Sequence, residues 1–270
     1  CARVRERRQT IGAADQGVAG TGMIVKSIAS VLSPGGRSGR LSILIFHRVL
    51  AHRDPVLNWD LDAADFYRTI GWMKDWFNVL PLEQAVVRLK ERTLPPRAAA
   101  ITFDDGYADN CTVAMPILQA HGLTATFFIA TAYLDGGRMW NDTVIESVRR
   151  CQESRLDLSR EGLGVHQLTS ADAIRQAIIS ILSDVKYRDS RERLRVVDYI
   201  AAVSGARLPP DLMMSSEQVR IMRRAGMSIG AHTATHPILA RLQPDEVRAE
   251  VAESKRFLES LLQERVGLFA

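Results

Sequence analysis

The chain has 270 residues, of which 46% are hydrophobic, so it is long enough to bury one large α/β core. Residues 1–40 hold seven of the 35 basic residues and two of the 31 acidic ones, which leaves 28 basic and 29 acidic residues in the rest. A nearly neutral body argues against a phosphate-reading, nucleic-acid-binding surface, and it suits a neutral or weakly charged substrate.

The N-terminal segment, residues 1–40, is basic and rich in Gly and Arg, and we expect it to be flexible and outside the fold. Cys1 stands in place of a start Met, so we expect processing or truncation there, and Met23 favours a translated leader. No run approaches the roughly 18 apolar residues of a membrane span, and no secretory apolar segment is seen. The sequence thus predicts a cytoplasmic protein by default, or a cell-envelope site if the N-terminus is processed.

The three cysteines, Cys1, Cys111 and Cys151, are scattered along the chain. An odd number without close spacing supports neither a disulfide framework nor a cysteine-based metal cluster.

From residue 41 onward, apolar runs alternate with helical patterns. Leu41 to Phe46 is typical of a buried parallel strand. A helix is predicted over 63–76, because Phe66, Ile70 and Met73 recur at helical spacing. The same alternation continues with a short run at 77–80, a helix at 82–92, a strand at 98–103, a helix at 108–120 and a strand at 124–130.

Residues 141–212 interrupt this alternation with mainly helical patterns, and we call them the helical insertion. Thr169 is followed three residues later by Asp172, which indicates a helix start before an apolar face. We expect this insertion to form a cap or side wall. The regular pattern returns with a capping box at Ser215 to Gln218, a helix to Ala225, a strand at 227–231, a helix from Pro244 and the start of a strand at 266–270.

Strands that alternate with helices predict a parallel sheet or a (β/α) barrel, in which the carboxyl ends of the strands share one rim. Polar residues follow three of the predicted strands: His47, the pair Asp104 and Asp105, and His232 with His236 four residues later. One carboxylate and two neutral imidazoles make a three-ligand site for a zinc-like ion that keeps a position open for water. The second carboxylate is then free to act as a base.

Each feature alone also has an ordinary structural explanation. Asp104-Asp105-Gly106 fits a turn, and His232 with His236 fits a helix start in which Pro237 is the first helical residue. His47 fits a hydrogen-bonded core histidine. Their conjunction at the ends of separate strands favours a functional site.

Two strings resemble a known family. Ile101 to Tyr107 and Gly230 to Leu239 are similar to the first two motifs of the polysaccharide deacetylases, the NodB homology domain of carbohydrate esterase family 4. The similar layout extends from residue 41 to the end, except for the insertion. The resemblance implies a distorted (β/α) barrel of the NodB type and a divalent metal, most commonly zinc. It implies that Asp104 is the general base and that the backbone N–H of Tyr107 donates to the oxyanion. The implied metal ligands are Asp105, His232 and His236.

The string Leu44 to Val49 resembles the first strand of the circularly permuted branch that acts on poly-N-acetylglucosamine. This resemblance makes His47 the general acid. We expect Trp140 and Asp142 to contact substrate. The alternatives are that Trp140 is an ordinary wall residue and that Asp142 is the N-cap of a helix that begins at Thr143. The family's later motifs do not occur before Ala270, so we expect a domain over 41–270 that is truncated at its C-terminus.

The predicted function is a metal-dependent hydrolase that removes N-acetyl groups from polysaccharide or oligosaccharide containing N-acetylglucosamine. Two alternatives stay open: a hydrolase of the same fold that cleaves another amide, an imide or an acetyl ester, and a noncatalytic carbohydrate-binding protein. A phosphoryl-transfer enzyme is disfavoured, because no glycine-rich phosphate loop is found.

Overall fold

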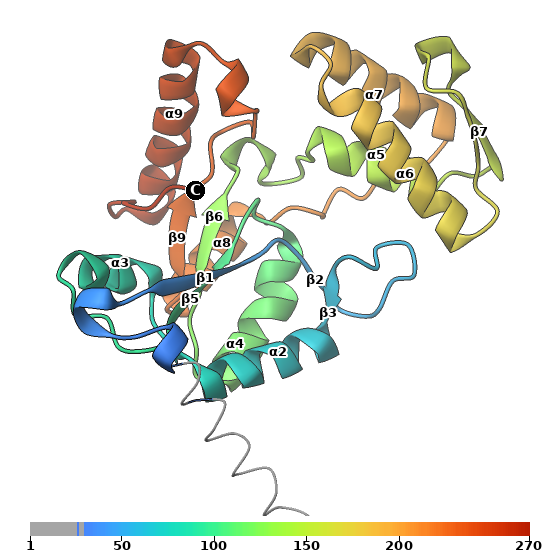
Figure 1. Ribbon diagram of the computed structural model, residues 1–270. Coiled ribbons are helices and arrows are strands. Elements are labelled where there is room, and N and C mark those ends of the chain that lie inside the picture. Colours follow the sequence, from blue (N-terminus) through green and yellow to red (C-terminus); the bar gives the residue numbers. More distant parts are fainter. Residues whose placement is uncertain (1–25, 27–29) are drawn as a thin grey trace, which may run out of the picture.

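A computed structural model of the chain describes Lys26 and residues 30–270, and its central feature is a five-stranded parallel sheet (Figure 1). β4 (Asn78–Val79) pairs with the start of β5 (Ala98–Phe103). The other strands are neighbours in the order β1 (Leu41–Phe46), β5, β6 (Thr126–Ile129) and β9 (Ser228–Ala231). The strands predicted at 41–46, 98–103, 124–130 and 227–231 are therefore confirmed to within two residues.

Four helices share one core with the sheet: α2 (Ala63–Trp76), α4 (Met115–Ala120), α8 (Ser216–Arg224) and α9 (Pro244–Leu262). The predicted period of α2 is confirmed, because Phe66, Ile70 and Met73 are its buried residues. The predicted capping box is also confirmed, since the side chains of Ser215 and Gln218 hydrogen-bond each other's backbone amides at the start of α8. Local sequence signals thus fix where these helices begin and which face they bury.

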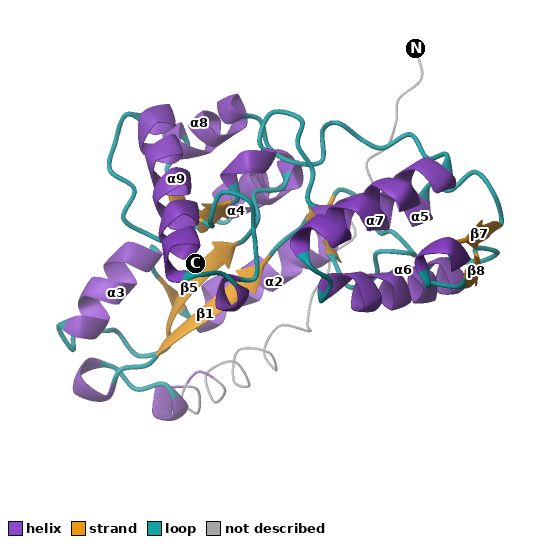
Figure 2. Cartoon of the chain, turned by 90° about the horizontal axis from the view of Figure 1, so that it is seen from above, coloured by secondary structure: helices purple, strands orange, loops and turns teal. Residues whose placement is uncertain are grey.

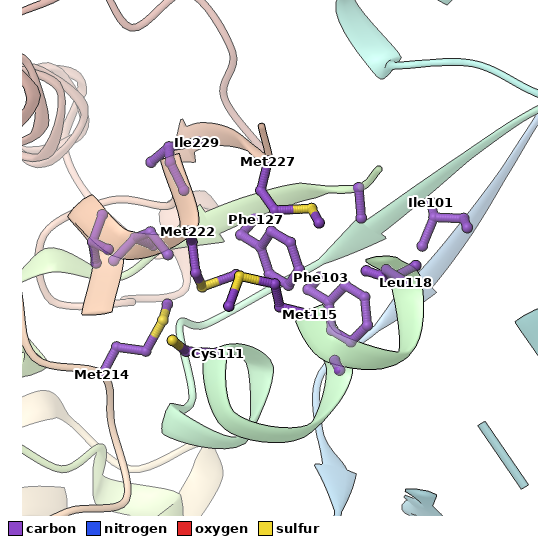
Figure 3. Packing of buried hydrophobic residues seen from close by; sticks show 14 of the residues in the cluster. Ile101, Phe103, Cys111, Met115, Leu118, Phe127, Met214, Met222, Met227 and Ile229 are labelled. Atoms are coloured by element: carbon purple, nitrogen blue, oxygen red, sulfur yellow. The ribbon is translucent and has the colours of Figure 1, made fainter. Parts of the chain in front are cut away.

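The core beneath the ends of β1 and β5 is aromatic. The ring of Phe103 stacks on Phe46 and Phe127 with centroid distances of 5.3 and 4.7 Å, and Phe66 meets it edge-on at 5.7 Å. Figure 3 shows Phe103 and Phe127 side by side, with methionine side chains such as Met222 filling the space around them. Burial of each ring contributes about 1.5–3 kcal/mol, so the strand ends rest on a rigid base.

The other face of the sheet is less covered. Leu82 of α3 (Leu82–Lys90) packs with Ala100 and Phe128 there. On β1, however, the side chains of Ile43 and Ile45 are 46% and 60% exposed. The expectation that Leu41 to Phe46 is a buried strand is therefore wrong at Ile43 and Ile45, which belong to none of the hydrophobic clusters of the described residues.

The helix predicted at 108–120 contains an irregular turn near its start. Ala108 and Asp109 are helical, Asn110–Ala114 form a π-helical turn, and α4 continues from Met115. The buried Asn110 side chain donates from Nδ2 to the His47 carbonyl oxygen at 2.9 Å. A π-helical turn next to a strand end is a frequent feature of functional sites.

The helical insertion forms a lobe beside the sheet, as Figures 1 and 2 both show. Its helices are α5 (Trp140–Arg149), α6 (Ala171–Lys186) and α7 (Ser190–Ser204), and they share a separate hydrophobic core. The antiparallel hairpin of β7 (Arg155–Asp157) and β8 (Val165–Gln167) was not predicted from the sequence. The start of α6 lies one residue later than predicted, because Ser170 rather than Thr169 caps the helix.

The remaining elements are short. β2 (Val49–Leu50) pairs with β3 (Leu61–Asp62), and single 3₁₀ turns occur at Gly36–Ser38, Thr131–Tyr133, Ser159–Glu161 and Leu239–Arg241. Within the expected N-terminal segment, the Gly36 amide donates to the Leu94 carbonyl and the Arg97 amide to the Ser33 carbonyl, so these residues lie against the fold. Residues 1–25 and 27–29 lie outside the described residues. Among the helices in the described part of the chain, none is long and apolar enough to cross a membrane.

Candidate active site

The carboxyl ends of β1, β5 and β9 meet at one edge of the sheet, as the parallel arrangement requires. The Asp104 amide, just after β5, donates to the Phe46 carbonyl at the end of β1, at 2.9 Å. The His232 amide, just after β9, donates to the Ile129 carbonyl at the end of β6, at 3.1 Å. Backbone hydrogen bonds between neighbouring strands therefore place the predicted site residues along one rim.

Three side chains converge at this rim. Asp105, His232 and His236 each offer a ligand atom, and these atoms lie within 4.8 Å of one another. The Nε2 atoms of His232 and His236 are 3.5 and 3.3 Å from Asp105 Oδ1. The predicted aspartate and histidine pair are thus brought together from segments more than 120 residues apart.

The same three residues fit a divalent cation. Asp105 Oδ1 is buried and has no hydrogen-bond partner in the described structure, which is costly unless a cation is bound. His232 Nδ1 lies 2.7 Å from the Ala270 carbonyl oxygen, so Nδ1–H can donate there and leave the Nε2 lone pair free for a metal. One carboxylate and two imidazoles form a donor set that suits zinc and its neighbours.

The backbone at the site is held in unusual conformations. Asp105, Thr233 and His236 have φ values of 77°, 60° and 51°, a left-handed region that non-glycine residues seldom adopt. Such strain persists where the surroundings impose it. The alternative that Pro237 is the first residue of a helix is wrong, since only the short 3₁₀ turn at Leu239–Arg241 follows it.

Glu250 of α9, which was not predicted from the sequence, holds the turn between His232 and His236 by hydrogen bonds. Its carboxylate accepts from the Ala234 and Thr235 amides at 2.9 and 2.8 Å, and from the Thr235 hydroxyl at 2.6 Å. Within the turn, the His236 amide donates to Thr233 Oγ1 at 3.0 Å. No local pattern marks Glu250, because its partners lie 15 and 16 residues earlier in a loop.

The two neighbouring carboxylates have opposite electrostatic surroundings. Burial raises the pKa of Asp104 above its usual range, although the charges on His232 and His47 oppose this. Burial also acts to raise the pKa of Asp105, but contact with His232 and the charge on His236 lower it overall. Asp105 is therefore the better anionic ligand, and Asp104 the better proton acceptor of the pair.

A cavity of about 480 Å³ opens beside the three ligands and is lined in part by His47, Asp105, Tyr107, Asp142 and His236. The predicted acid, two of the three predicted ligands and the predicted oxyanion residue thus line the same cavity, whereas His232 and Asp104 are not among its lining residues. This space falls in the size range of small-ligand sites.

Comparisons with known proteins agree with this geometry. A sequence profile described as polysaccharide deacetylase matches residues 91–180 and 190–270, more than half of the chain. The chain belongs to the polysaccharide deacetylase family. A Bacillus subtilis (strain 168) protein of this family, YxkH, is 26% identical over 95 residues, which are 34% of this chain and 33% of YxkH. The chain therefore matches about a third of the length of this relative.

Two solved structures share the fold of this deacetylase-family chain. Streptococcus pyogenes deacetylase PplD in complex with acetate aligns with a TM-score of 0.51 and 19% identity, over 85% of this chain and 72% of PplD. IcaB from Ammonifex degensii aligns with a TM-score of 0.50 and 16% identity, over 88% and 74% of the two chains. These likenesses confirm the predicted NodB-type (β/α) barrel class.

A buried polar network underlies the cavity of this polysaccharide deacetylase homologue. The Tyr107 hydroxyl donates to the Asp142 carboxylate, with oxygen distances of 3.0 and 3.2 Å. The Arg48 guanidinium lies 4.9 Å from the centroid of the Tyr107 ring and pairs with Asp109 at 2.9 Å. Burial raises the pKa of Asp142 to about 7 and that of Asp60, which lines the same cavity, to about 6. The sequence does not predict Arg48 and Asp109, because their roles depend on tertiary contacts.

The two predicted substrate residues, Trp140 and Asp142, line different cavities. Asp142 lies in the first turn of α5, which begins at Trp140, so the alternative that Asp142 is the N-cap of a helix at Thr143 is wrong. Asp142 lines the cavity beside the metal ligands, whereas Trp140 lines a second cavity next to it. The two residues therefore face different parts of the surface.

Proposed function

We propose that this protein is a metal-dependent hydrolase that removes N-acetyl groups from polysaccharide containing N-acetylglucosamine. The observation that carries the proposal is the convergence of Asp105, His232 and His236 beside a cavity that His47 also lines, in a member of the polysaccharide deacetylase family. Zn²⁺ is the proposed ion, since it favours imidazole and carboxylate ligands in sites that keep one position open.

The proposed chemistry is hydrolysis of an amide bond. A divalent cation held by Asp105, His232 and His236 would supply Lewis-acid catalysis, polarising the acetyl carbonyl and lowering the pKa of a water molecule. Asp104, with its raised pKa, accepts the proton that the attacking water loses. His47 then donates a proton to the leaving nitrogen, because an amide anion is a very poor leaving group.

The Tyr107 backbone N–H is the proposed donor to the developing oxyanion. Tyr107 faces Met213 in an isolated antiparallel bridge. The flanking hydrogen bonds of this bridge run from the Ala108 amide to Leu212 and from the Met214 amide to Gly106. Tyr107 therefore occupies a non-hydrogen-bonded position, and the bridge leaves its own amide free. A single such donor contributes about 3 kcal/mol to transition-state stabilisation.

The walls of the cavity favour a neutral sugar. The half-exposed Trp59 offers an aromatic surface of the kind that pyranose rings pack against, and Asn141 and Asp142 offer hydrogen-bonding groups. Cationic Arg48 is already neutralised by Asp109, so it does not make this wall an anion site. A chain with nearly equal numbers of acidic and basic residues after residue 40 fits the same substrate class.

The test combines metal analysis with an acetate-release assay on the full chain. We expect about one zinc per chain and release of acetate from chito-oligosaccharides that chelation abolishes and zinc restores. Cleavage only of imides, ring amides or simple acetyl esters would identify another hydrolase on this scaffold. Glycan binding by a protein that takes up no divalent metal would identify a noncatalytic carbohydrate-binding protein.

A further inference from the structure

A second cavity, of about 450 Å³, lies between α6 and the turn after β9. Its apolar wall includes Trp140, Ile179, Leu182 and Pro237, and its polar wall includes Asn141 and Lys186. Three of these residues, Ile179, Leu182 and Lys186, come from one side of α6. The helical insertion therefore builds most of this cavity.

The second cavity adjoins the first. Asn141 and His236 line both cavities, so a ligand that extends past His236 from the first cavity meets the second one. The His236 side chain is 40% exposed, compared with 15% for His232, which agrees with its place at the junction. The proposed metal site thus lies between two adjoining spaces.

We propose that this second cavity is a subsite that binds the pyranose next to the one that is deacetylated. The inference rests on the proposed function and adds a role for the helical insertion, whose α6 supplies the wall. The glycan then spans His236, with the reacting acetamide in the first cavity and the neighbouring ring against Trp140 and Ile179.

The mixed chemistry of the wall selects a sugar over an acyl chain. A pyranose has C–H faces that pack on apolar side chains and hydroxyls that bond polar ones. An acyl chain would cover the Asn141 amide without offering it a hydrogen bond, at a cost of a few kcal/mol. The Asn141 carbonyl oxygen has no hydrogen-bond partner among the residues described, so the amide is not committed elsewhere.

The wall is held in place at Trp140, and at Ile179 it offers an apolar side chain that the insertion core does not use. The Arg193 guanidinium lies 5.1 Å from the centroid of the Trp140 ring, which restricts the indole. Ile179 is 46% exposed, whereas Ile178 and Ile181 on the other side of α6 are fully buried in the insertion core. An apolar side chain that the core does not use is therefore available for a ligand.

The test compares Ile179→Asp with a matched control, Val203→Asp, which changes an equally exposed apolar residue on α7 of the same lobe. The substrates are the chitin pentasaccharide and p-nitrophenyl acetate, which is too small to reach past His236. We expect the ratio of kcat/KM for the pentasaccharide to that for p-nitrophenyl acetate to fall about tenfold in Ile179→Asp. Val203→Asp should leave the ratio unchanged, and Lys186→Ala should lower it.

Calorimetric binding of the pentasaccharide separates this inference from the proposed function. A wild-type protein that binds the pentasaccharide but releases no acetate contradicts the proposed function, while weaker binding by Ile179→Asp still supports the subsite. Equal affinities of wild type and Ile179→Asp, or an unchanged kcat/KM ratio, overturn the subsite even when acetate is released. Absence of any binding by the wild type overturns both.

Discussion

Asp104 and Asp105 are neighbours in the chain, yet they differ in burial and in the direction in which their pKa is shifted. Asp105 is buried against two imidazoles, whereas Asp104 is less buried and has a raised pKa. We expect Asp104→Asn to keep zinc and lose turnover by about 10²–10⁴-fold, because a positioned base is removed without a ligand. Asp105→Ala and His236→Ala should lose both zinc and turnover. Zinc content and acetate release are measured on each variant, and loss of zinc from Asp104→Asn would reverse the assignment.

Glu250 illustrates a residue that acts on the site through another segment. It is the acceptor for three donors in the turn before His236, so its truncation should loosen the position of that ligand. We expect Glu250→Ala to weaken zinc binding by about 10–100-fold, as is usual for groups that orient metal ligands. Competition with a chromophoric chelator measures the affinity. Glu253→Ala, which changes an exposed residue of the same helix, is the control, and an equal loss there would show a general effect on α9.

Asp142 is buried beside Tyr107, and burial raises its pKa to about 7 from a usual value of 3.8. Between about pH 4 and pH 7 the folded state holds a proton that the unfolded state has released, so the free energy of unfolding falls as the pH rises through this window. The full effect is on the order of 4 kcal/mol. We expect Asp142→Asn, which stays neutral, to flatten this part of the stability profile. Urea denaturation at pH 4.5 and pH 8 tests it, and parallel profiles for the two proteins would show that Asp142 ionises normally.

At the scale of elements, the loop at 51–60 is the link between the insertion and the active-site cavity. Val56 and Leu57 are buried in the insertion core, and Asp54 pairs with Arg149 of α5. The same loop ends in Trp59 and Asp60, which line the cavity. The insertion therefore fixes the loop that forms one wall of the site.

Arg175 of α6 is the residue through which this link can be tested, because it donates to the carbonyl oxygens of Pro55 and Val56. Arg175→Ala removes these two hydrogen bonds and so loosens the loop, without changing the proposed metal ligands. We expect KM for chito-oligosaccharides to rise roughly three- to tenfold with little change in kcat, the signature of lost substrate binding. Arg248→Ala is the matched control, since Arg248 makes the same kind of pair with an aspartate three residues earlier on an exposed helix. A fall in kcat at constant KM would contradict this account.

Sequence patterns predicted the elements whose signals are local. The 63–76 helix and the capping box at Ser215 were found because periodicity and caps are written in consecutive residues. The β7–β8 hairpin was missed, since strands of three residues with charged members carry no clear alternation. The exposure of Ile43 and Ile45 could not be predicted from the sequence either, because burial of a strand face depends on which helices cover it.

In the candidate site, too, the features with local sequence signals were predicted and those that depend on tertiary contacts were not. Asp105, His232 and His236 were predicted as a group from their places after strands, and the structure brings them together. Glu250 could not be predicted, because a carboxylate on an amphipathic helix has the pattern of any solvated face. The separation of Trp140 from Asp142 into two cavities likewise depends on how α5 enters the lobe, which the sequence pattern does not specify.

At the scale of the whole molecule, the chain has one core under the sheet and another inside the insertion. The proposed metal site joins the residues that follow β5 and β9, so a bound cation ties together strands of the sheet core only. Zinc at about 100 times its Kd stabilises the folded state by about 2.7 kcal/mol, which corresponds to a rise in Tm of roughly 5–10 °C. We expect this rise in the wild type and in Asp104→Asn but not in His236→Ala.

Hydrogen exchange measures which segments of the chain zinc stabilises. Zinc should slow exchange of the amides at 104–108 and 229–237, which flank the proposed ligands, because opening either segment would release the ion. Amides in α7 should exchange at the same rate with and without zinc, since this helix packs in the insertion core and not on the sheet core. A uniform slowing over both cores would show that the two unfold as one unit. Slowing confined to α7, or an unchanged Tm rise in His236→Ala, would place the cation elsewhere.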